Sequence, residues 1–526
     1  MHLNRTSFLE SIKKSNGYDV IIIGGGATGL GIAVDAASRG YSTLLLEQED
    51  FAKGTSSRST KLIHGGVRYL QQGNISLVLE ALRERGILIR NAPHLVKRQA
   101  FLIPNYRWWE GPFYGIGLKI YDLLAGSLNL GPSRRLSYDL TIEKLPSLGR
   151  EGLRGGILYY DGQFDDSRLA IHLARTAVSH GAHCMNYSKV NELVKHRNKI
   201  RGVRVSDQLT GEEYEVQGRV VINATGVFTD DILEMDTPES EHLITPSQGI
   251  HLVIDKKFSP GDTAIMIPKT DDGRVLFAVP WHGKVLLGTT DTPVDKPDLE
   301  PVALEEEVEF ILKHASRYLS VSPSRKDVRS VFVGLRPLVK GGEDESDTSS
   351  ISRDHTLFTS ESGLVTITGG KWTTYRKMAE DTVDQASHSA GLPSRPCITE
   401  ELKIHGWTSE NGSGESLFME DPLHHYGTDK AGVEELIYEE PELGGRIHPR
   451  LPYLKAEVIW GVRYEMAMTV EDILSRRTRS LLLDARASIE SAPDVAQLMA
   501  RELKKDQKWI DRQIEVYEAV ANNYLI

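Results

Sequence analysis

The sequence predicts an α/β fold: a Rossmann-type nucleotide-binding domain with an inserted, mostly antiparallel substrate-binding sheet, followed by an all-α C-terminal domain. Three observations predict this arrangement. Strand–glycine–helix units occur around residues 19–39, 219–226 and 364–387. Short apolar strands separated by turn residues lie between the second and third units. After residue 455 the chain is rich in helix-forming residues, which favours a helical end.

The composition is that of an ordinary globular protein and excludes several functions. The 526 residues suffice for several structural units at about 150 residues each. Lys and Arg number 62 and Asp and Glu number 73, so the formal net charge is −11. An acidic chain without a basic tail argues against nucleic acid as a partner. The two cysteines, Cys184 and Cys397, form no CxxC pair, so we expect neither thiol redox chemistry nor a metal site.

The apolar stretches are too short for a targeting or membrane-spanning segment. Residues 1–17 are polar and mixed in charge, and they lack the apolar core of a signal peptide. No stretch approaches the roughly 20 apolar residues that span a bilayer. The sequence therefore predicts a cytoplasmic protein, or one that lies peripherally on the inner face of the cell membrane.

The first βαβ unit carries a glycine-rich turn in the G-x-G-x-x-G pattern. A buried strand at residues 19–23 leads into it, a helix at about 29–39 follows, and a second strand covers 43–46. Gly24 permits the tight turn, Gly26 lets the backbone approach a pyrophosphate, and Gly29 allows close helix–strand packing. The helix N-terminus offers free amides to phosphates. This part of a nucleotide site is expected from Gly24, Gly26, Ala27, Thr28 and Gly29.

Glu47 ends the second strand, where its carboxylate can accept hydrogen bonds from ribose hydroxyls. That position disfavours a cofactor with a 2′-phosphate. The whole context predicts dinucleotide binding, although it does not separate FAD from NAD.

Later segments divide the chain into a two-part core and a helical domain. A strand at 219–222 runs into a turn at 223–226, and short strands at 264–267, 275–279 and 285–288 have antiparallel spacing. In the tail, residues 470–484 and 494–521 are the clearest helical segments. The predicted units are a core at 1–399, with a nucleotide-binding part at about 18–90, 200–245 and 330–395 and a substrate part at about 91–199 and 246–329, and a helical domain at 400–526.

Residues 54–70 (GTSSRSTKLIHGGVRYL) closely resemble the signature of the FAD-dependent glycerol-3-phosphate dehydrogenases, which belong to the D-amino-acid-oxidase-like flavoproteins. Segments 334–338 (GLRPL), 352–355 (SRDH) and 369–376 (GGKWTTYR) match the same family in the same order, and 288–291 (GTTD) matches more weakly. The resemblance covers about residues 18–390 and extends loosely to Asp472 and residues 476–479 in the tail.

This resemblance implies non-covalent FAD, oxidation of sn-glycerol 3-phosphate to dihydroxyacetone phosphate, and transfer of the electrons to a membrane quinone. Some relatives pass the electrons to oxygen instead. A flavoenzyme of the same class that acts on an amino or hydroxy acid is an alternative, and a flavin-binding protein without turnover is another.

The resemblance and the turn at 223–226 together extend the set of expected FAD contacts. Residues 371–374 begin a helix, whose amides would stabilise negative charge on the reduced flavin. The turn at 223–226 is expected to pack against the adenosine half of the cofactor. The further FAD contacts are expected from Thr55, Ser56, Ser57, Lys61, Leu62, His64, Gly65, Gly66, Ala224, Thr225, Gly226, Gly370, Lys371, Thr373 and Thr374.

Oxidation of a secondary alcohol needs a base for the hydroxyl proton, and histidine has a suitable pKa. His64 and His251 are the two candidates, and His64 has the alternative role of only hydrogen-bonding the flavin. Arg336 is a candidate for stabilising the developing alkoxide. A substrate phosphate needs cationic donors, for which arginine is suited. The substrate site is expected from Arg68, Tyr69, Arg336, Arg353 and Lys371.

An apolar segment at residues 112–124 follows Trp108 and Trp109. Aromatic residues beside an apolar helix are typical of a membrane headgroup interface, and a helix of the protein core is the alternative. The helical tail is a candidate surface for a homodimer, a candidate cap over the active site, or both.

Overall fold

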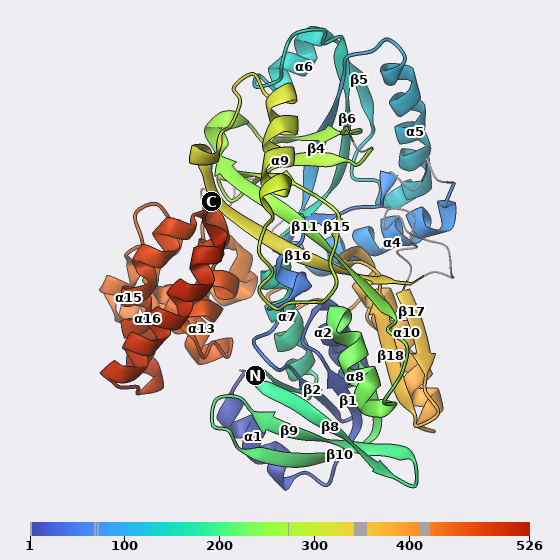
Figure 1. Ribbon diagram of the computed structural model, residues 1–526, viewed down its shortest axis with the longest axis vertical. Helices are drawn as coiled ribbons and strands as arrows, with labels where there is room; N and C mark the ends of the chain where they lie inside the picture. Colours follow the sequence, from blue (N-terminus) through green and yellow to red (C-terminus); the bar gives the residue numbers. More distant parts are fainter. Residues whose placement is uncertain (1–2, 68–69, 71–72, 272, 341–354, 410–420) are drawn as a thin grey trace.

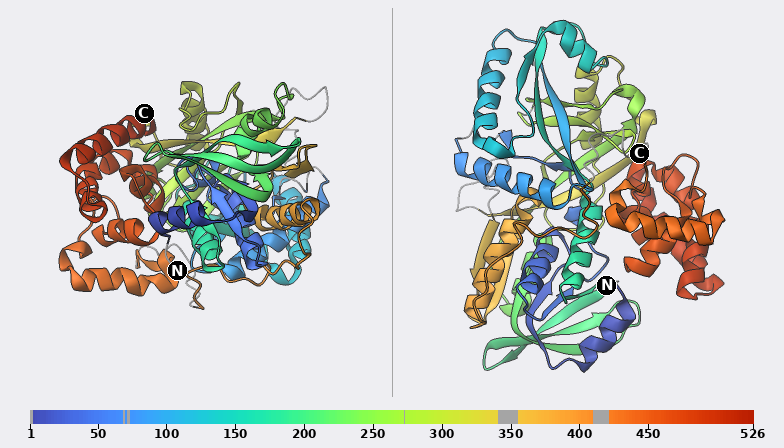
Figure 2. Two further views of the ribbon diagram at one scale, coloured as in Figure 1. Left: turned by 90° about the horizontal axis from the view of Figure 1, so that it is seen from below. Right: turned by 180° about the vertical axis from the view of Figure 1, so that it is seen from behind.

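The computed structural model describes residues 3–67, 70, 73–271, 273–340, 355–409 and 421–526. Two sheets with their covering helices form the main body, and a group of helices from the end of the chain lies to one side of both sheets (Figures 1 and 2). The predicted α/β class, with a second sheet and a helical C-terminal region, is confirmed.

The first sheet is built around β1 (Tyr18–Ile23), which pairs in parallel with β2 (Thr43–Leu46) on one side and β10 (Glu213–Asn223) on the other. Ile23 is in register with Leu46 and with Asn223, so these strands end at one edge of the sheet. Ligands of open α/β sheets bind outside that edge. The sheet continues through β18 (Leu364–Gly369) and β17 (His355–Thr359) on one side and β7 (His183–Met185) on the other.

The apolar run of β1 is buried, and three helices that pack side by side cover a face of the sheet. These are α2 (Ala27–Ser38), α7 (Asp166–Ser179) and α10 (Tyr375–Ser389), and α2 packs against the other two. At the contact of α2 with α10, a Cβ atom on Gly31 would lie 2.8 Å from the Tyr375 ring. The small residue is therefore what lets the two helices approach.

An antiparallel extension of the first sheet joins β10 to β9 (Lys199–Asp207) and β8 (Ser188–His196). Helix α1 (Arg5–Lys14) contacts β7 and β10, and α8 (Thr229–Asp236) follows β10. Here α7, β7 and β8 lie with the nucleotide-binding sheet, whereas the sequence division assigns residues 91–199 to the substrate part. The sequence does not show which sheet a short strand such as β7 or β8 joins, because this depends on the strand with which it pairs.

The second sheet has ten strands and is mostly antiparallel, with one parallel pair between β12 and β4. The predicted strands at 264–267, 275–279 and 285–288 are β12, β13 and β14 of this sheet. Its members are β3 (Leu62–Ile63), β4 (Val96–Asn105), β5 (Arg134–Leu136), β6 (Gly155–Phe164), β11 (Ile244–Asp255), β12 (Thr263–Ile267), β13 (Leu276–Trp281), β14 (Lys284–Gly288), β15 (Thr292–Pro293) and β16 (Val328–Val339).

Four helices accompany the second sheet: α4 (Ile75–Asn91), α5 (Glu110–Ala125), α6 (Tyr138–Lys144) and α9 (Glu305–Tyr318). On α5 the side chains of Leu118 and Tyr121 are buried, while Ile116 and Leu123 are exposed. The helix at 112–124 is therefore neither a core helix nor a fully exposed one.

The C-terminal helical region (residues 421–526) contains α12 (Lys430–Glu439), α13 (Lys455–Tyr464), α14 (Ser480–Leu483), α15 (Ala485–Leu503) and α16 (Gln507–Ala521). The prediction of one helical segment at 494–521 is wrong because Lys504 takes a left-handed conformation and Asp506 caps a new helix. Residues 470–484 are not one helix either, since a π-helical turn (Asp472–Arg477) ends at Thr478 before α14 begins.

Candidate functional site

A cavity of about 840 Å³ lies at the carboxyl edge of the first sheet and reaches the second sheet. Ligand sites typically measure about 300–1,000 Å³. Its walls come from segments far apart in the sequence, within residues 23–28, 46–60, 224–228, 334–338 and 367–373. The three strand–glycine units predicted from the sequence thus meet around one space.

The glycine-rich turn after β1 is so tight that side chains in place of its glycines would collide with the neighbouring backbone. Gly24 has a φ of 110°, and a Cβ atom on it would lie 2.6 Å from the carbonyl oxygen of Ala224. A Cβ atom on Gly29 would lie 1.9 Å from the carbonyl oxygen of Gly24. The turn therefore keeps the start of α2, with Ala27 and Thr28, on the cavity surface.

Glu47 lines the cavity at the end of β2. Its carboxylate accepts hydrogen bonds from the backbone amides of Gly25 (2.6 Å) and Glu49 (2.9 Å). Burial raises the pKa of this carboxyl to about 7, against the pull of the two amides. The group is held rigidly and can exchange hydrogen bonds with hydroxyl groups of a ligand.

Three side-chain contacts tie together the segments that close the other end of the cavity. The Thr55 hydroxyl donates to the carbonyl of Leu335 (2.6 Å), and the Trp372 indole donates to the carbonyl of Ser56 (2.9 Å). The Thr373 hydroxyl donates to the carbonyl of His64 at 3.4 Å. The sequence motifs at 54–70, 334–338 and 369–376 therefore form one site, as their shared resemblance implies.

These features fit an extended dinucleotide such as FAD. The glycine turn and the start of α2 suit a pyrophosphate, because the backbone amides and helix dipole favour an anion. Glu47 suits ribose hydroxyls. Gly370 has a φ of 73°, and a Cβ atom added to it would lie 2.4 Å from the sulfur of Met378. The backbone at the other end of the cavity therefore also carries no side chain at this position. Within the described ranges, no group of three or more His, Cys, Asp or Glu side chains is placed to hold a metal ion.

His251, one of the two candidate bases, lies on β11 and lines the cavity. Its Nε2 atom is 2.9 Å from the Thr60 hydroxyl, and its ring stacks on Phe332 with a centroid distance of 4.8 Å. Burial lowers the pKa of His251 well below its usual range, and the charges of Lys61 and Arg336 add to this. The imidazole is therefore neutral near pH 7, and the same burial and charges oppose its protonation.

His64, the other candidate base, also lines the cavity, as do Arg336 and Lys371. Arg336 pairs with Asp291 (3.1 Å) and donates to the carbonyl of Thr290 (3.0 Å), which fixes the direction of its guanidinium group. The cavity thus combines both candidate histidines with several cations, among them Arg336 and Lys371. Arg68, Tyr69 and Arg353 lie outside the described residues, so their predicted roles stay predictions.

Several predicted cofactor contacts support the cavity from behind and do not line it. Lys61 is fully buried: its ammonium group pairs with Asp166 (2.7 Å) and donates to the carbonyl of Ser57 (2.7 Å). Burial also lowers the pKa of Lys61 to about 7. The Gly65 amide donates to the Tyr121 hydroxyl. The predicted residues away from the cavity surface are Gly29, Ser57, Lys61, Gly65, Gly66 and Thr374.

The remaining predicted contacts do line the cavity: Gly24, Gly26, Ala27, Thr28, Glu47, Thr55, Ser56, Leu62, His64, Ala224, Thr225, Gly226, Gly370, Lys371 and Thr373. Sequence reasoning missed Thr60 and Trp372, although both lie inside matched motifs and Thr60 precedes a predicted contact. It also missed Ser188, Lys189 and Val190, which line the cavity at the start of β8. The sequence division placed these residues in the substrate part, so nothing connected them with the nucleotide-binding sheet.

Comparison with known proteins agrees with this site. Residues 19–376 match the family described as "FAD dependent oxidoreductase", and residues 365–510 match the "C-terminal domain of alpha-glycerophosphate oxidase". The chain is 41% identical to the mitochondrial glycerol-3-phosphate dehydrogenase of Bos taurus, over 97% of this chain and 74% of that protein. It is 42% identical to the probable mitochondrial glycerol-3-phosphate dehydrogenase of Caenorhabditis elegans, over 95% of this chain and 72% of that protein.

The fold matches a solved structure over its whole length. The glycerol-3-phosphate dehydrogenase of Bacillus halodurans, solved in complex with FAD, has a TM-score of 0.80 and 31% identity, covering 100% of this chain and 98% of that one. The L-alpha-glycerophosphate oxidase of Mycoplasma pneumoniae has a TM-score of 0.56 and 16% identity, covering 75% of this chain and 100% of that one, and shares the fold. The chain is therefore an FAD-dependent oxidoreductase that belongs to the family of the glycerol-3-phosphate dehydrogenases.

Proposed function

We propose that this enzyme oxidises sn-glycerol 3-phosphate to dihydroxyacetone phosphate and passes the electrons to a quinone in the membrane. One observation carries the proposal: the cavity that fits FAD also presents two histidines and the cations Arg336 and Lys371. A phosphorylated alcohol needs both, a base for its hydroxyl and positive charge for its phosphate. The relatives that are 41% and 42% identical to this chain are named glycerol-3-phosphate dehydrogenases, which supports the same substrate.

The glycine turn after β1 and Glu47 would hold FAD, which would supply a two-electron acceptor for the hydride of the substrate carbon. His251 is buried and neutral, and it receives the hydroxyl proton as the alcohol is oxidised. Arg336, fixed by Asp291, stabilises the negative charge that develops on the alcohol oxygen. Lys371 binds the phosphate together with Arg68, Tyr69 and Arg353. His64 holds the flavin or shares the role of base.

We propose that α5 and the chain before it rest on the membrane surface. The side chains of Trp108 and Leu123 are 76% and 79% exposed, and Ile116 is 64% exposed. Arg134 and Arg135 lie exposed on β5, next to α5, and suit anionic headgroups. Nowhere in the described part of the chain is a helix both long and apolar enough to cross a bilayer. An apolar face exposed on one side of α5 fits contact with the membrane surface without spanning it.

The proposal is tested by adding glycerol 3-phosphate to the purified holoprotein without oxygen and following the visible absorption of the flavin. Bleaching is expected, with fast recovery on addition of a quinone and slow recovery in air. Fast recovery in air would instead identify an oxidase that reduces oxygen. No bleaching with glycerol 3-phosphate, but bleaching with an amino or hydroxy acid, would contradict the proposed substrate. A homodimer stays a prediction, which sedimentation of the purified protein checks.

A further inference from the structure

The segment from Asp50 to Lys61 separates the cofactor cavity from the C-terminal helical region. Its residues between Ala52 and Ser56 line the cavity without a gap. Asp50 and Ser57, by contrast, hydrogen-bond to side chains of the C-terminal region. This part of the cavity wall is therefore one segment thick, with the cofactor space on one side and residues 471–479 on the other.

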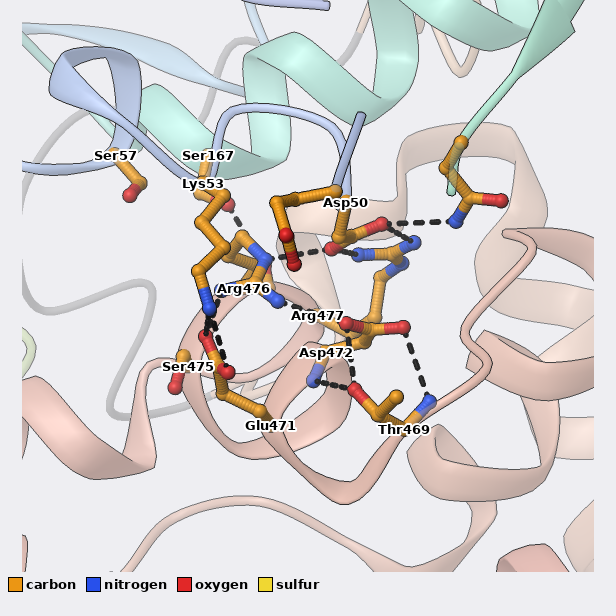
Figure 3. A network of polar contacts seen from close by, with 12 residues as sticks. Asp50, Lys53, Ser57, Ser167, Thr469, Glu471, Asp472, Ser475, Arg476 and Arg477 are labelled. Carbon is orange, nitrogen blue, oxygen red and sulfur yellow. Dashed lines mark hydrogen bonds and ion pairs between the residues drawn. The ribbon is translucent and has the colours of Figure 1, made fainter. Parts of the chain in front are cut away.

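Asp50 is the first point at which the C-terminal region holds this wall (Figure 3). Arg477 binds both oxygens of the Asp50 carboxylate, at 2.7 and 2.9 Å, and Arg476 binds one of them at 2.6 Å. The Asp50 and Arg477 side chains are 0% exposed. Two arginines on one buried carboxylate form a strong, directional contact, because the low local dielectric increases the attraction.

Arg476 is itself held by two carboxylates at the start of the π-helical turn. Arg476 also binds Glu471 (2.8 Å) and Asp472 (2.7 Å). Glu471 in turn binds Lys53, a residue of the cavity wall, at 2.8 Å. Asp472 accepts a hydrogen bond from Tyr187 at 2.6 Å. Figure 3 shows Lys53 of the wall segment converging with Glu471, Asp472 and Arg476 of the C-terminal region.

A second point of attachment lies at the other end of the wall segment. Arg479 donates to the carbonyl of Ser57 (2.6 Å) and pairs with Asp166 (3.1 Å). Lys61 binds the same carbonyl and the other oxygen of the Asp166 carboxylate, both at 2.7 Å. Asp166 also accepts from the Ser59 amide and hydroxyl. The wall is thus anchored at Asp50, before the cavity-lining stretch 52–56, and again at Ser57, directly after that stretch.

We propose that Glu471, Asp472, Arg476, Arg477 and Arg479, which we call the clamp, hold the 50–61 wall in its FAD-binding shape and thereby set how tightly the cofactor is kept. The clamp residues do not touch the cavity, so they are positioning residues. The proposal rests on FAD binding, a property of the family, and not on the identity of the substrate. It gives the C-terminal helical region a role at the cofactor site.

A matched control separates this role from simple support of the fold. Arg175 on α7 is 3% exposed and pairs with Asp429 of the C-terminal region, so it crosses the same boundary. Neither residue lines the cavity or contacts the 50–61 segment. Arg175 also lies 4.0 Å from Glu465, which contacts Arg477 of the C-terminal region. Arg175→Lys keeps the positive charge beside Glu465 and loses the guanidinium contact with Asp429, so the attachments of the wall are expected to stay in place.

The experiment dilutes purified holoprotein and follows the rise of flavin fluorescence as FAD is released, alongside the melting temperature in excess FAD. Arg477→Lys loses the paired contact with Asp50, and Glu471→Gln keeps its size but loses the charge that binds Lys53. Both are expected to release FAD at least tenfold faster than the unsubstituted protein. Arg175→Lys is expected to lower the melting temperature to a similar extent while its release rate stays within twofold.

Unchanged FAD release in both clamp variants would overturn the proposal. So would equally accelerated release in Arg175→Lys at the same loss of melting temperature. If Arg477→Lys does not fold, Glu471→Gln and Thr469→Ala decide the question, because the Thr469 hydroxyl donates to Asp472 at 2.8 Å and its loss is milder. FAD release involves no substrate, so its outcome is independent of whether glycerol 3-phosphate is oxidised.

Discussion

The Nε2 atom of His251 lies 2.9 Å from the Oγ1 atom of Thr60, which joins the second sheet to the wall of the cofactor cavity. Both residues line the cavity, and His251 is buried and neutral. The hydroxyl group therefore sets the orientation of the imidazole that we assign as the base.

Thr60→Val keeps the shape of the side chain and removes the hydroxyl. We expect the rate of flavin reduction by glycerol 3-phosphate to fall about tenfold, since one hydrogen bond contributes about 0.5–1.5 kcal/mol. Stopped-flow absorbance without oxygen measures this rate. Thr141→Val is the control, because Thr141 also donates one hydrogen bond (2.7 Å) but lies on α6, away from the cavity. An unchanged rate in Thr60→Val would remove Thr60 from the mechanism.

Arg336→Lys replaces a planar guanidinium, fixed by Asp291 and Thr290, with a single mobile ammonium group. We expect kcat/KM for glycerol 3-phosphate to fall about 100-fold, which corresponds to about 2.7 kcal/mol. Steady-state kinetics with a soluble quinone measures it. Arg329→Lys lies on the same strand and loses a comparable pair with Asp255, outside the cavity. Equal losses in both variants would argue against a role for Arg336 at the substrate.

Gly29→Ala places a Cβ atom 1.9 Å from the carbonyl oxygen of Gly24, so the turn cannot close around the cofactor. We expect the folded variant to retain little FAD, with a lower melting temperature that excess FAD does not restore. The ratio of flavin to protein absorbance measures retention. At Gly117 an added Cβ meets nothing within 4 Å, so Gly117→Ala is expected to bind FAD normally. Normal flavin content in Gly29→Ala would show that the turn can rearrange.

Burial lowers the pKa of His94 to about 3, whereas the unfolded chain titrates near 6.5. Below pH 6.5 the unfolded state therefore takes up a proton that the folded state does not, and the stabilising contribution of a neutral His94 is lost as the pH falls. Buried carboxyls with raised pKa values, such as Glu47 and Glu457, act in the opposite direction. Because these carboxyls are the same in the unsubstituted protein and in a His94 variant, their contribution cancels when the stabilities of the two proteins are compared.

We expect His94→Gln to be less stable than the unsubstituted protein at pH 7, and the gap to narrow by about 2 kcal/mol by pH 5, at about 1.4 kcal/mol per pH unit below 6.5. Urea unfolding at several pH values measures the gap. His180→Gln changes an exposed histidine and serves as the reference. A gap that stays constant or widens on acidification would contradict the assignment.

Ile116→Asn combined with Leu123→Asn removes two exposed apolar side chains from the outer face of α5. Each loses about 1.5–3 kcal/mol of burial in the headgroup region, so binding to vesicles of phosphatidylglycerol should weaken more than tenfold. Co-sedimentation measures it. Tyr438→Ser removes an apolar side chain that is 89% exposed in the C-terminal region and is expected to leave vesicle binding unchanged. Unaltered vesicle binding by the α5 variant would show that this face of α5 does not contact the membrane.

Local patterns predicted the fold where each element has its own signal. The strand at 43–46 and the glycine turn after residue 23 were found because apolar runs and glycines identify them residue by residue. The break at Lys504 was missed, because a lysine in a left-handed conformation carries no sequence signal comparable to glycine. The sheet to which β7 and β8 belong depends on pairing between distant strands, and the sequence contains no direct record of it.

The candidate site was predictable to the extent that its residues lie in motifs. Glu47 and the glycines reach the cavity because the βαβ geometry places them there. Lys61 lies in the strongest motif but pairs with Asp166 behind the cavity wall, since a backbone segment alternates between its two sides. Asp472 and residues 476–479 were singled out by resemblance alone, and their contact with the cavity wall was not predicted, because the arginines meet Asp50 more than 400 residues away along the chain.

The cofactor cavity draws its walls from Ile23 at one extreme and Thr373 at the other. A growing chain on the ribosome therefore lacks one side of the flavin pocket until the segment around Thr373 has emerged. A complete flavin pocket is therefore available only after both sheets have been translated. Truncated products that end before this point would accumulate as colourless protein, so the yellow colour of a preparation reports on completeness as well as on cofactor supply.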